Sequence, residues 1–254
     1  MSAFALLGLT LRARRRRLLV LGAFALLFLA AAVAARVLVS DADGHVDPDR
    51  LFMVGGYPLV SAMLLFGWLL GRFPLIATLV LMAGLASDDR RDGLARLYAV
   101  RPVSPLAVYG VRAVTLGAVA FLFCGALLPL FDLILIGTWA GPATLVLVAS
   151  YVLVYGGLTA LLSVWSRGDA WLALLCAIAS MVWDALRRAD MLTVPPGTRD
   201  LVTFVLPPQA ALFELEGAFG SLQPIPWDAF LYVAAYGLVM FALAGLSLAK
   251  RDLA

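Results

Sequence analysis

The sequence predicts an all-α, polytopic membrane protein, a helical bundle of six transmembrane helices with both the N- and C-termini on the cytoplasmic side. Apolar residues make up 63% of the 254 residues and charged residues only 14%, whereas a soluble domain is nearer half apolar and a quarter charged. The mean hydropathy is +0.99. A soluble fold of this length cannot hide so much apolar surface, so lipid must cover much of it.

The length of the chain leaves room for a transmembrane domain and for little else. A spanning helix needs about 20 predominantly apolar residues. Six such helices and their connections use up residues 1–254. We therefore expect a single transmembrane domain.

The N-terminal segment, residues 1–17, is predicted to lie at the cytoplasmic surface as an interfacial segment. A short apolar stretch is followed by five arginines, Arg12, Arg14, Arg15, Arg16 and Arg17, which favour the cytoplasmic side and anionic lipid headgroups. The first span then covers 18–39. A cleaved signal peptide is the alternative, but the apolar run of 22 residues is longer than a signal core of about 7–15.

The second apolar stretch, residues 51–86, is too long for one straight crossing. Glycine, proline and one arginine, Arg72, interrupt it. We place the second span at about 62–86 and expect 51–61 to form an outer extension or a partly re-entrant piece. The acidic loop before it, 40–50, contains His45 and is expected to be external.

The remaining elements follow from apolar runs separated by charged or Pro/Gly-rich stretches. They are a cytoplasmic loop at 87–105, spans at about 106–131, 143–165 and 170–186, an extracytoplasmic segment at 187–226 and a last span at 227–249. This topology places thirteen basic residues inside and five outside, in agreement with the positive-inside rule. Within the outer segment, 207–220 is expected to form a short helix that gates the exit.

The residue types argue against several kinds of active site. Lys250 is the only lysine and His45 the only histidine, so a Walker-type nucleotide loop and an H-E-x-x-H zinc site are both excluded. We expect no enzymatic activity, metal site or bound cofactor in this chain, and no nucleic-acid partner. Cys124 and Cys176 lie in apolar segments and are interpreted as core residues without a disulfide.

The loop after the second span carries a helix signal. Ser87 can act as a cap, and Asp88 and Asp89 place negative charge at the helix N-terminus. An apolar stripe follows at helical spacing, and an Arg-Pro pair ends it. The residues concerned are Asp88, Asp89, Gly93, Leu94, Leu97, Tyr98, Arg101 and Pro102. Either a protein partner contacts this helix, or it lies on headgroups with Arg90, Arg91 and Arg96 against lipid.

Residues 74–114, PLIATLVLMAGLASDDRRDGLARLYAVRPVSPLAVYGVRAV, resemble the corresponding stretch of the type-two ABC transporter permeases. Gly93, Leu94, Leu97 and Pro102 match the pattern of that family, Asp89 takes the place of a glutamate, and Arg112 stands where a lysine is common. Pro105 and Gly110 depart from the pattern. The resemblance extends weakly over the basic N-terminal helix, the outer Pro-rich segment and the C-terminal LSLAKRDLA.

The resemblance implies the permease subunit of an exporter in the bacterial inner (plasma) membrane. Residues 87–105 would contain the coupling helix, and the partners would be an ABC ATPase subunit, a second permease copy and membrane lipids. ATP and Mg²⁺ would be bound by the ATPase subunit. The cargo is left open, with a hydrophobic or amphipathic molecule slightly favoured by the apolar spans.

Three alternatives remain at this point. The haem-exporter subunits of cytochrome c maturation have similar loop features. A secondary transporter would carry several buried ionisable groups near the midplane. A non-transporting membrane scaffold or assembly factor would need neither an ATPase nor such a site.

Two charged residues are predicted to lie at the same depth within spans. Arg72 and Asp184 are each 15 residues from the cytoplasmic end of their spans. A charge in the bilayer usually faces protein or water, so we expect these two to face the bundle interior and to pair, within or between subunits. The alternative is that Arg72 extends to the headgroups and Asp184 meets water.

Overall fold

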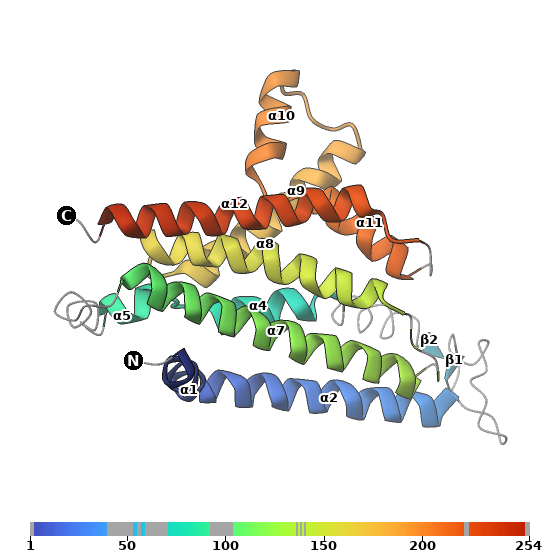
Figure 1. Ribbon diagram of the computed structural model, residues 1–254. Helices are drawn as coiled ribbons and strands as arrows, with labels where there is room; N and C mark the ends of the chain where they lie inside the picture. Colours follow the sequence, from blue (N-terminus) through green and yellow to red (C-terminus); the bar gives the residue numbers. More distant parts are fainter. Residues whose placement is uncertain are drawn as a thin grey trace.

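The computed structural model describes residues 3–39, 53–54, 57–58, 71–91, 104–135, 137, 139, 141–220 and 224–251. These residues are mainly α-helical (Figure 1). The helices are α1 (Ala3–Ala13), α2 (Arg15–Val39), α4 (Phe73–Met82), α5 (Ser87–Arg91), α7 (Pro105–Leu135), α8 (Ala143–Trp165), α9 (Asp169–Arg188), α10 (Pro196–Val205), α11 (Gln209–Gly220) and α12 (Trp227–Arg251). Two short strands, β1 (Met53–Val54) and β2 (Tyr57–Pro58), form an antiparallel pair.

Five of the described helices are long and apolar enough to cross a membrane: α2, α7, α8, α9 and α12. The 25 residues of α2 extend about 37 Å at 1.5 Å per residue, more than the ~30 Å hydrocarbon layer. This is the architecture of a multi-pass membrane protein. These helices coincide with five of the six predicted spans. The sixth, at 62–86, lies partly outside the described residues, and α4 is its described helix.

The long helices form a bundle in which α2, α7, α8 and α12 run side by side (Figure 1). The N-terminal helix α1 and the last turn of α12 lie at the same end of this bundle, together with α5 (Figure 1). We call this the α5 end. Helix α10, in which no residue is buried, projects from the side of the bundle (Figure 1).

Helix α8 is the centre of the core. Its side chains Leu147, Tyr151 and Tyr155 are fully buried, and it packs against α4, α7, α9, α11 and α12. Two buried hydroxyls of α8 bond to their own helix: the hydroxyl of Ser150 donates to the carbonyl of Val146, and that of Thr159 donates to the carbonyl of Tyr155. A hydroxyl bonded in this way can sit in an apolar core without an unsatisfied donor.

Two glycines bring α8 and α12 into close contact. A Cβ added at Gly157 would lie 2.5 Å from the carbonyl oxygen of Gly237, and one added at Gly237 would lie 2.6 Å from the carbonyl group of Leu153. Small residues of this kind let transmembrane helices approach each other backbone to backbone. The close α8–α12 pair follows from these two positions.

The segment predicted as extracytoplasmic contains two helices, α10 and α11. The helix expected at 207–220 is present as α11 (Gln209–Gly220), and it packs against the bundle. Its residues Ala211, Leu212 and Leu215 are buried against α8, α9 and α12. The apolar spacing of these three residues gives α11 one face that must be covered.

In 51–61 the strand pair lies where an extension or re-entrant piece was expected. The acidic loop 40–50 and residues 92–103 lie outside the described residues.

Candidate functional site

The turn between α4 and α5 joins several distant parts of the chain. Helix α4 ends at Met82, and the chain reverses through Gly84, whose φ of +71° is in the left-handed region. Glycine adopts this conformation without steric cost. Helix α5 then begins at Ser87.

Two arginines from the N-terminal cluster bind this turn. Arg14 donates to the Asp88 carboxylate at 2.9 Å and to the Gly84 carbonyl at 2.9 Å. Arg17 donates to the Val80 carbonyl at 3.2 Å, to the Ala83 carbonyl, and to Asp88 at 3.3 Å. The carbonyls at the end of α4 lack partners within their own helix, and the guanidinium groups supply donors and positive charge there.

This result separates the five arginines that the sequence groups together. Arg12, Arg15 and Arg16 are exposed, where they can reach headgroups as predicted. The side chains of Arg14 and Arg17 are instead 12% and 33% exposed. They are part of a protein contact, which the sequence pattern alone did not indicate.

Asp169 binds the same turn from the start of α9. Its Oδ2 accepts hydrogen bonds from the backbone N–H of Gly84 at 2.8 Å and from the Ser87 hydroxyl at 3.3 Å. Its Oδ1 accepts from the Ala170 N–H at 2.8 Å, and the residue is buried. Ser87, expected to cap its own helix, is therefore the first helical residue of α5 and donates to α9 instead.

A further ion pair joins α5 to α7. The Arg112 guanidinium donates to the carboxylate of Asp89, and it lies 5.8 Å from the centre of the Tyr109 ring. Together with the contacts of Arg14, Arg17 and Asp169, this pair ties the start of α5 to α2, α7 and α9. We call this group of contacts the α5 cluster.

Asp88 and Asp89, two of the residues predicted for the coupling site, bind arginines of the same chain, and the Asp89 side chain is only 9% exposed. Their negative charges are drawn inward because basic side chains of α2 and α7 lie beside the turn. The contact of this region with an ATPase subunit stays a prediction. The other six residues predicted for this site, Gly93, Leu94, Leu97, Tyr98, Arg101 and Pro102, lie outside the described residues.

Replacing Gly84 by alanine is expected to break the α5 cluster. A Cβ at this position would lie 2.1 Å from Oδ2 of Asp88, so the carboxylate that holds Arg14 and Arg17 would have to move. The positive φ adds strain, and we expect a loss of more than about 1 kcal/mol in the free energy of unfolding. Thermal unfolding of the purified chain in detergent measures this loss of stability.

Gly22→Ala in α2 is the matched control, since no described atom lies within 4 Å of its added Cβ. Equal melting of the two variants would contradict this role of Gly84.

The two charges predicted within the membrane are both buried but do not pair with each other in the chain. Arg72 is 6% and Asp184 is 4% exposed. Arg72 donates to the carboxylate of Glu216 in α11 and to the hydroxyl of Tyr151 in α8, and the Tyr151 hydroxyl donates to Glu216. Asp184 is bound by Arg187 at 3.2 Å and Arg188 at 2.8 Å, one turn further along α9.

The sequence missed Glu216 because this residue lies in the segment assigned to the outside. Its neighbours on α11 carried a signal: Ala211, Leu212 and Leu215 form an apolar face next to it, which indicates a packed helix. The Phe213 ring lies 5.0 Å from the guanidinium carbons of both Arg72 and Arg188. The two charge clusters therefore meet at one aromatic ring, although Arg72 and Asp184 keep separate partners.

The environment of Glu216 affects its protonation. Burial raises the pKa of this carboxyl group above its ordinary value, while the Tyr151 hydroxyl and the Arg72 guanidinium act in the opposite direction. At its other end α11 is held by a hydrogen bond of 3.2 Å from the Tyr155 hydroxyl to the Gln209 side chain. Two polar contacts, at Gln209 and seven residues further on at Glu216, thus fix α11 along α8.

No family model, curated protein or solved structure matches this chain.

Proposed function

We propose that this chain is the permease subunit of an ABC exporter, a six-span protein of the bacterial inner membrane with cytoplasmic termini that works with a second permease copy and a separate ATPase subunit. The observation that carries the proposal is the α5 cluster. The segment that resembles a coupling helix begins at α5, and the first turn of α5 is bonded to α2, α7 and α9. A force applied to this segment therefore acts on several spans at once.

The proposed mechanism divides the segment into two parts. The ATPase contacts residues beyond Arg91, where Leu94, Leu97 and Tyr98 form the predicted apolar stripe. Asp88 and Asp89 transmit the movement, because their ion pairs connect α5 to Arg14, Arg17 and Arg112. ATP binding closes the two ATPase subunits, and the spans repack between two states biased by nucleotide.

Purification from native membranes in a mild detergent tests this proposal. The tagged chain is expected to bring with it an ATPase subunit in a ratio of one to one, with vanadate-sensitive ATP hydrolysis. Leu97→Arg is expected to lose that subunit, because it places a charge in the predicted apolar contact. Leu201→Arg in α10 is the matched control, since Leu201 is exposed at 63% and its helix α10 projects from the bundle away from α5 (Figure 1).

The two variants distinguish a coupling contact from a general effect of added charge. Both should melt at the wild-type temperature and only Leu97→Arg should release the ATPase. A preparation without any ATPase, or equal ATPase content in both variants, would contradict the proposal.

A secondary transporter is the second candidate, and the buried group of Arg72, Tyr151 and Glu216 favours it. Ionisable side chains inside a membrane bundle often mark a pathway for protons or ions. Proteoliposomes that contain this chain alone distinguish the two candidates. A secondary transporter would dissipate an imposed proton gradient without ATP and would lose this activity in Glu216→Gln. The permease subunit alone is expected to leave the gradient unchanged.

A further inference from the structure

A small polar cavity lies between α9, α10 and the start of α11. Its volume is about 40 Å³, and its lining includes Ser180 and Asp184 of α9, Thr203 of α10, and Pro208 and Gln209 at the start of α11. The hydrogen-bonding state of these polar side chains indicates what the cavity can hold.

Gln209 brings an open hydrogen-bond donor to the cavity. The residue is only 2% exposed. Its Oε1 accepts a hydrogen bond of 3.2 Å from the Tyr155 hydroxyl, but its Nε2 has no hydrogen-bond partner among the described residues. A buried donor left in this way costs about 1–3 kcal/mol. The cavity beside it should therefore contain an acceptor.

Asp184 and Ser180 bring open acceptors to the same cavity. Oδ2 of Asp184 lies 2.8 Å from a nitrogen of Arg188, yet this buried oxygen accepts no hydrogen bond from the residues that the structure describes. The Ser180 hydroxyl donates to the Ala177 carbonyl at 2.8 Å, so its oxygen can still accept. A donor and two acceptors thus line one small space.

Water satisfies both kinds of atom at once. An anion could accept from Gln209, but the Asp184 carboxylate would repel it. A cation would be attracted to Asp184 and repelled by Arg187, which also lines the cavity. A water molecule can accept from Nε2 of Gln209 and donate to Oδ2 of Asp184. An ordered water needs roughly 10–15 Å³ of such space and two to four polar partners, so the cavity has room for about one to three.

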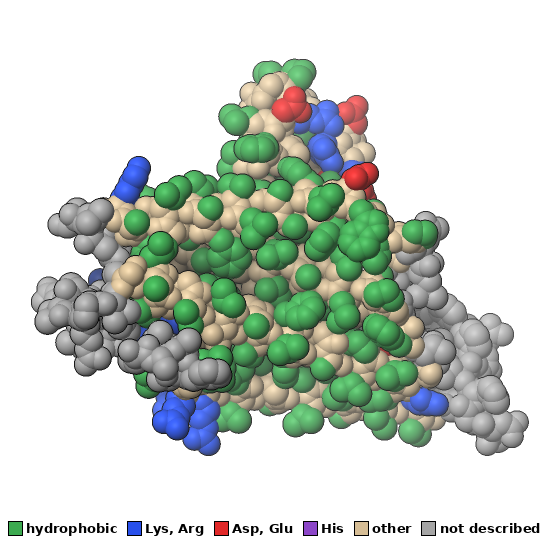
Figure 2. Space-filling model, in the orientation of Figure 1, with side chains coloured by type: hydrophobic (Ala, Val, Ile, Leu, Met, Phe, Trp, Pro, Cys, Tyr) green, Lys and Arg blue, Asp and Glu red, His purple; other side chains and the backbone are tan. Residues whose placement is uncertain are grey.

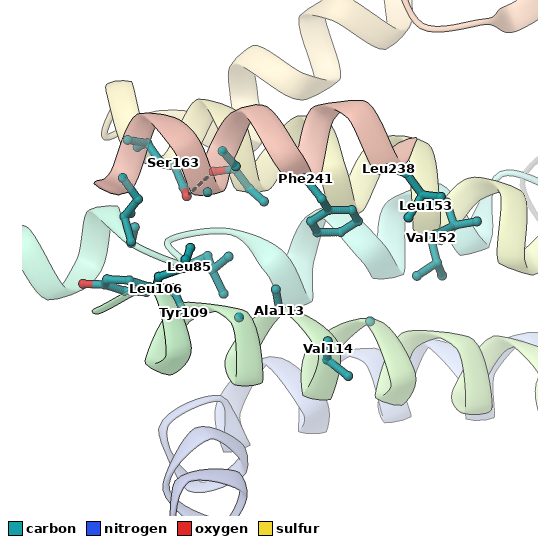
Figure 3. A pocket seen from close by; sticks show the side chains of 18 of the residues that line it. Leu85, Leu106, Tyr109, Ala113, Val114, Val152, Leu153, Ser163, Leu238 and Phe241 are labelled. Atoms are coloured by element: carbon teal, nitrogen blue, oxygen red, sulfur yellow. Dashed lines mark hydrogen bonds between the residues drawn. The ribbon is translucent and has the colours of Figure 1, made fainter. Parts of the chain in front are cut away.

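The largest hollow of the bundle differs from this cavity. A groove of about 650 Å³ lies between α7 and α12, over α8 (Figure 3). Among the residues that line it, only Tyr109 and Ser163 carry polar side-chain atoms, and the Ser163 hydroxyl already donates to the Ala160 carbonyl at 2.8 Å (Figure 3). A space with so few polar partners does not order water.

The polar cavity also lies beside a charged part of the surface. Figure 2 shows side chains of both charges over α10 and the end of α9, whereas apolar side chains cover the flank of the bundle. Arg187 belongs to the last turn of α9 and to the cavity lining. Charged groups keep water around them, so water can enter the cavity from this side.

We propose that this cavity binds ordered water, and that one water molecule accepts a hydrogen bond from Nε2 of Gln209 and donates one to the Asp184 carboxylate. The water joins the first turn of α11 to α9, in addition to the direct bond between Gln209 and Tyr155 of α8. The proposal does not depend on transport or on an ATPase.

Hydroxyl-radical labelling with pulsed X-rays tests the proposal on the full-length chain in detergent. The radicals form from water, so a buried side chain is hydroxylated where a bound water lies next to it. Peptide mass spectrometry locates the products. We expect labelling of Pro208, which is buried and lines the cavity. We expect none of Leu212, which is fully buried one turn further along α11 and outside the cavity lining.

Three variants assign the label to the Gln209 amide. Gln209→Leu should lose the label of Pro208, because an apolar cavity stays dry. Tyr155→Phe is the matched control: it removes the hydrogen bond to Oε1 and leaves Nε2 in place, so Pro208 should keep its label. Ala210→Leu fills the cavity from another lining position and replaces Gln209→Leu if that variant does not fold.

The contrary outcomes are distinct. An unlabelled Pro208 in the wild type would mean that the cavity is dry. Labelling that persists in Gln209→Leu or Ala210→Leu would mean that bulk water reaches Pro208 without a bound site. Loss of the label in Tyr155→Phe would contradict the role of Nε2. Thermal melts in equal concentrations of sodium chloride and sodium gluconate should coincide, and a higher melting temperature in chloride would assign the cavity to an anion.

Discussion

Glu216→Gln is expected to lower the free energy of unfolding by about 3–5 kcal/mol, because it leaves the Arg72 guanidinium buried without its carboxylate. Arginine cannot release its proton in a protein, so the positive charge of Arg72 persists at every working pH. Thermal unfolding of the purified chain in detergent measures the loss.

The reverse variant, Arg72→Met, is expected to lose less free energy of unfolding than Glu216→Gln, and its stability is expected to depend on pH. Without the cation, burial raises the pKa of Glu216 further above its ordinary value, so the folded state favours the protonated form. Stability should therefore increase as the pH falls through the pKa of the folded state, and decrease again as the pH rises above it. Thermal melts over a series of pH values test the sign of this dependence.

The double variant Arg72→Met/Glu216→Gln should recover most of the loss, because neither charge is left unpaired. The Arg72–Asp184 pair expected from the sequence provides the control. A double-mutant cycle over positions 72 and 216 should give a coupling energy of about 0.5–3 kcal/mol, and a cycle over 72 and 184 should give much less. A larger coupling between 72 and 184 would restore the original pairing, within or between subunits.

Gly237→Ala and Gly110→Ala are expected to have opposite effects, although both add one methyl group to a glycine in a transmembrane helix. At Gly237 the methyl would lie 2.6 Å from the carbonyl carbon and oxygen of Leu153. The backbone of α8 cannot move away as a side chain can by changing its rotamer. Helices α8 and α12 must therefore separate, which lowers the free energy of unfolding by about 1–3 kcal/mol. At Gly110 the methyl meets open space, and the variant should gain about 0.5–1 kcal/mol from the lower conformational freedom of alanine.

The two variants should be compared in one series of thermal melts, with Gly157→Ala as the partner position on α8. Gly157→Ala should behave like Gly237→Ala, since its methyl would lie 2.5 Å from the Gly237 carbonyl oxygen. If Gly237→Ala and Gly110→Ala both raised the melting temperature, the close contact between α8 and α12 would be wrong.

Local sequence features were enough to find the long helices. The span predicted at 143–165 coincides with α8 (Ala143–Trp165), because an uninterrupted apolar run between a Gly-Pro pair and a Ser-Arg-Gly-Asp turn has no other stable form in a membrane. The helix expected at 207–220 is present as α11. The sequence pattern shows that this helix has an apolar face, but not which other helices cover it.

The charged residues show the limit of that approach. Depth in the membrane correctly indicated that Arg72 and Asp184 are buried, but it did not indicate that Arg72 binds Glu216 within the chain; a pair of Arg72 and Asp184 between subunits stays a prediction. Glu216, 144 residues from Arg72, was missed because it lies in the segment that the sequence assigned to the outside. Asp88 and Asp89 were assigned to a coupling site, and the sequence pattern did not indicate their ion pairs with Arg14, Arg17 and Arg112. An ion pair depends on which helix surfaces pack together. The sequence does not show that packing, so it does not select one carboxylate as the partner of each arginine.

The sequence by itself determined that this is an all-α membrane chain, where its long helices begin and end, and that Arg72 and Asp184 must be sheltered from lipid. These properties depend on the length of apolar runs and on short-range turn chemistry, so nearby residues decide them. Only the tertiary structure decided that α11 is drawn into the bundle by Glu216, that two of the N-terminal arginines hold the turn before α5, and that α7, α8 and α12 leave a groove between them. Each of these results depends on contacts between segments far apart in the chain, and those contacts exist only after the helices have packed.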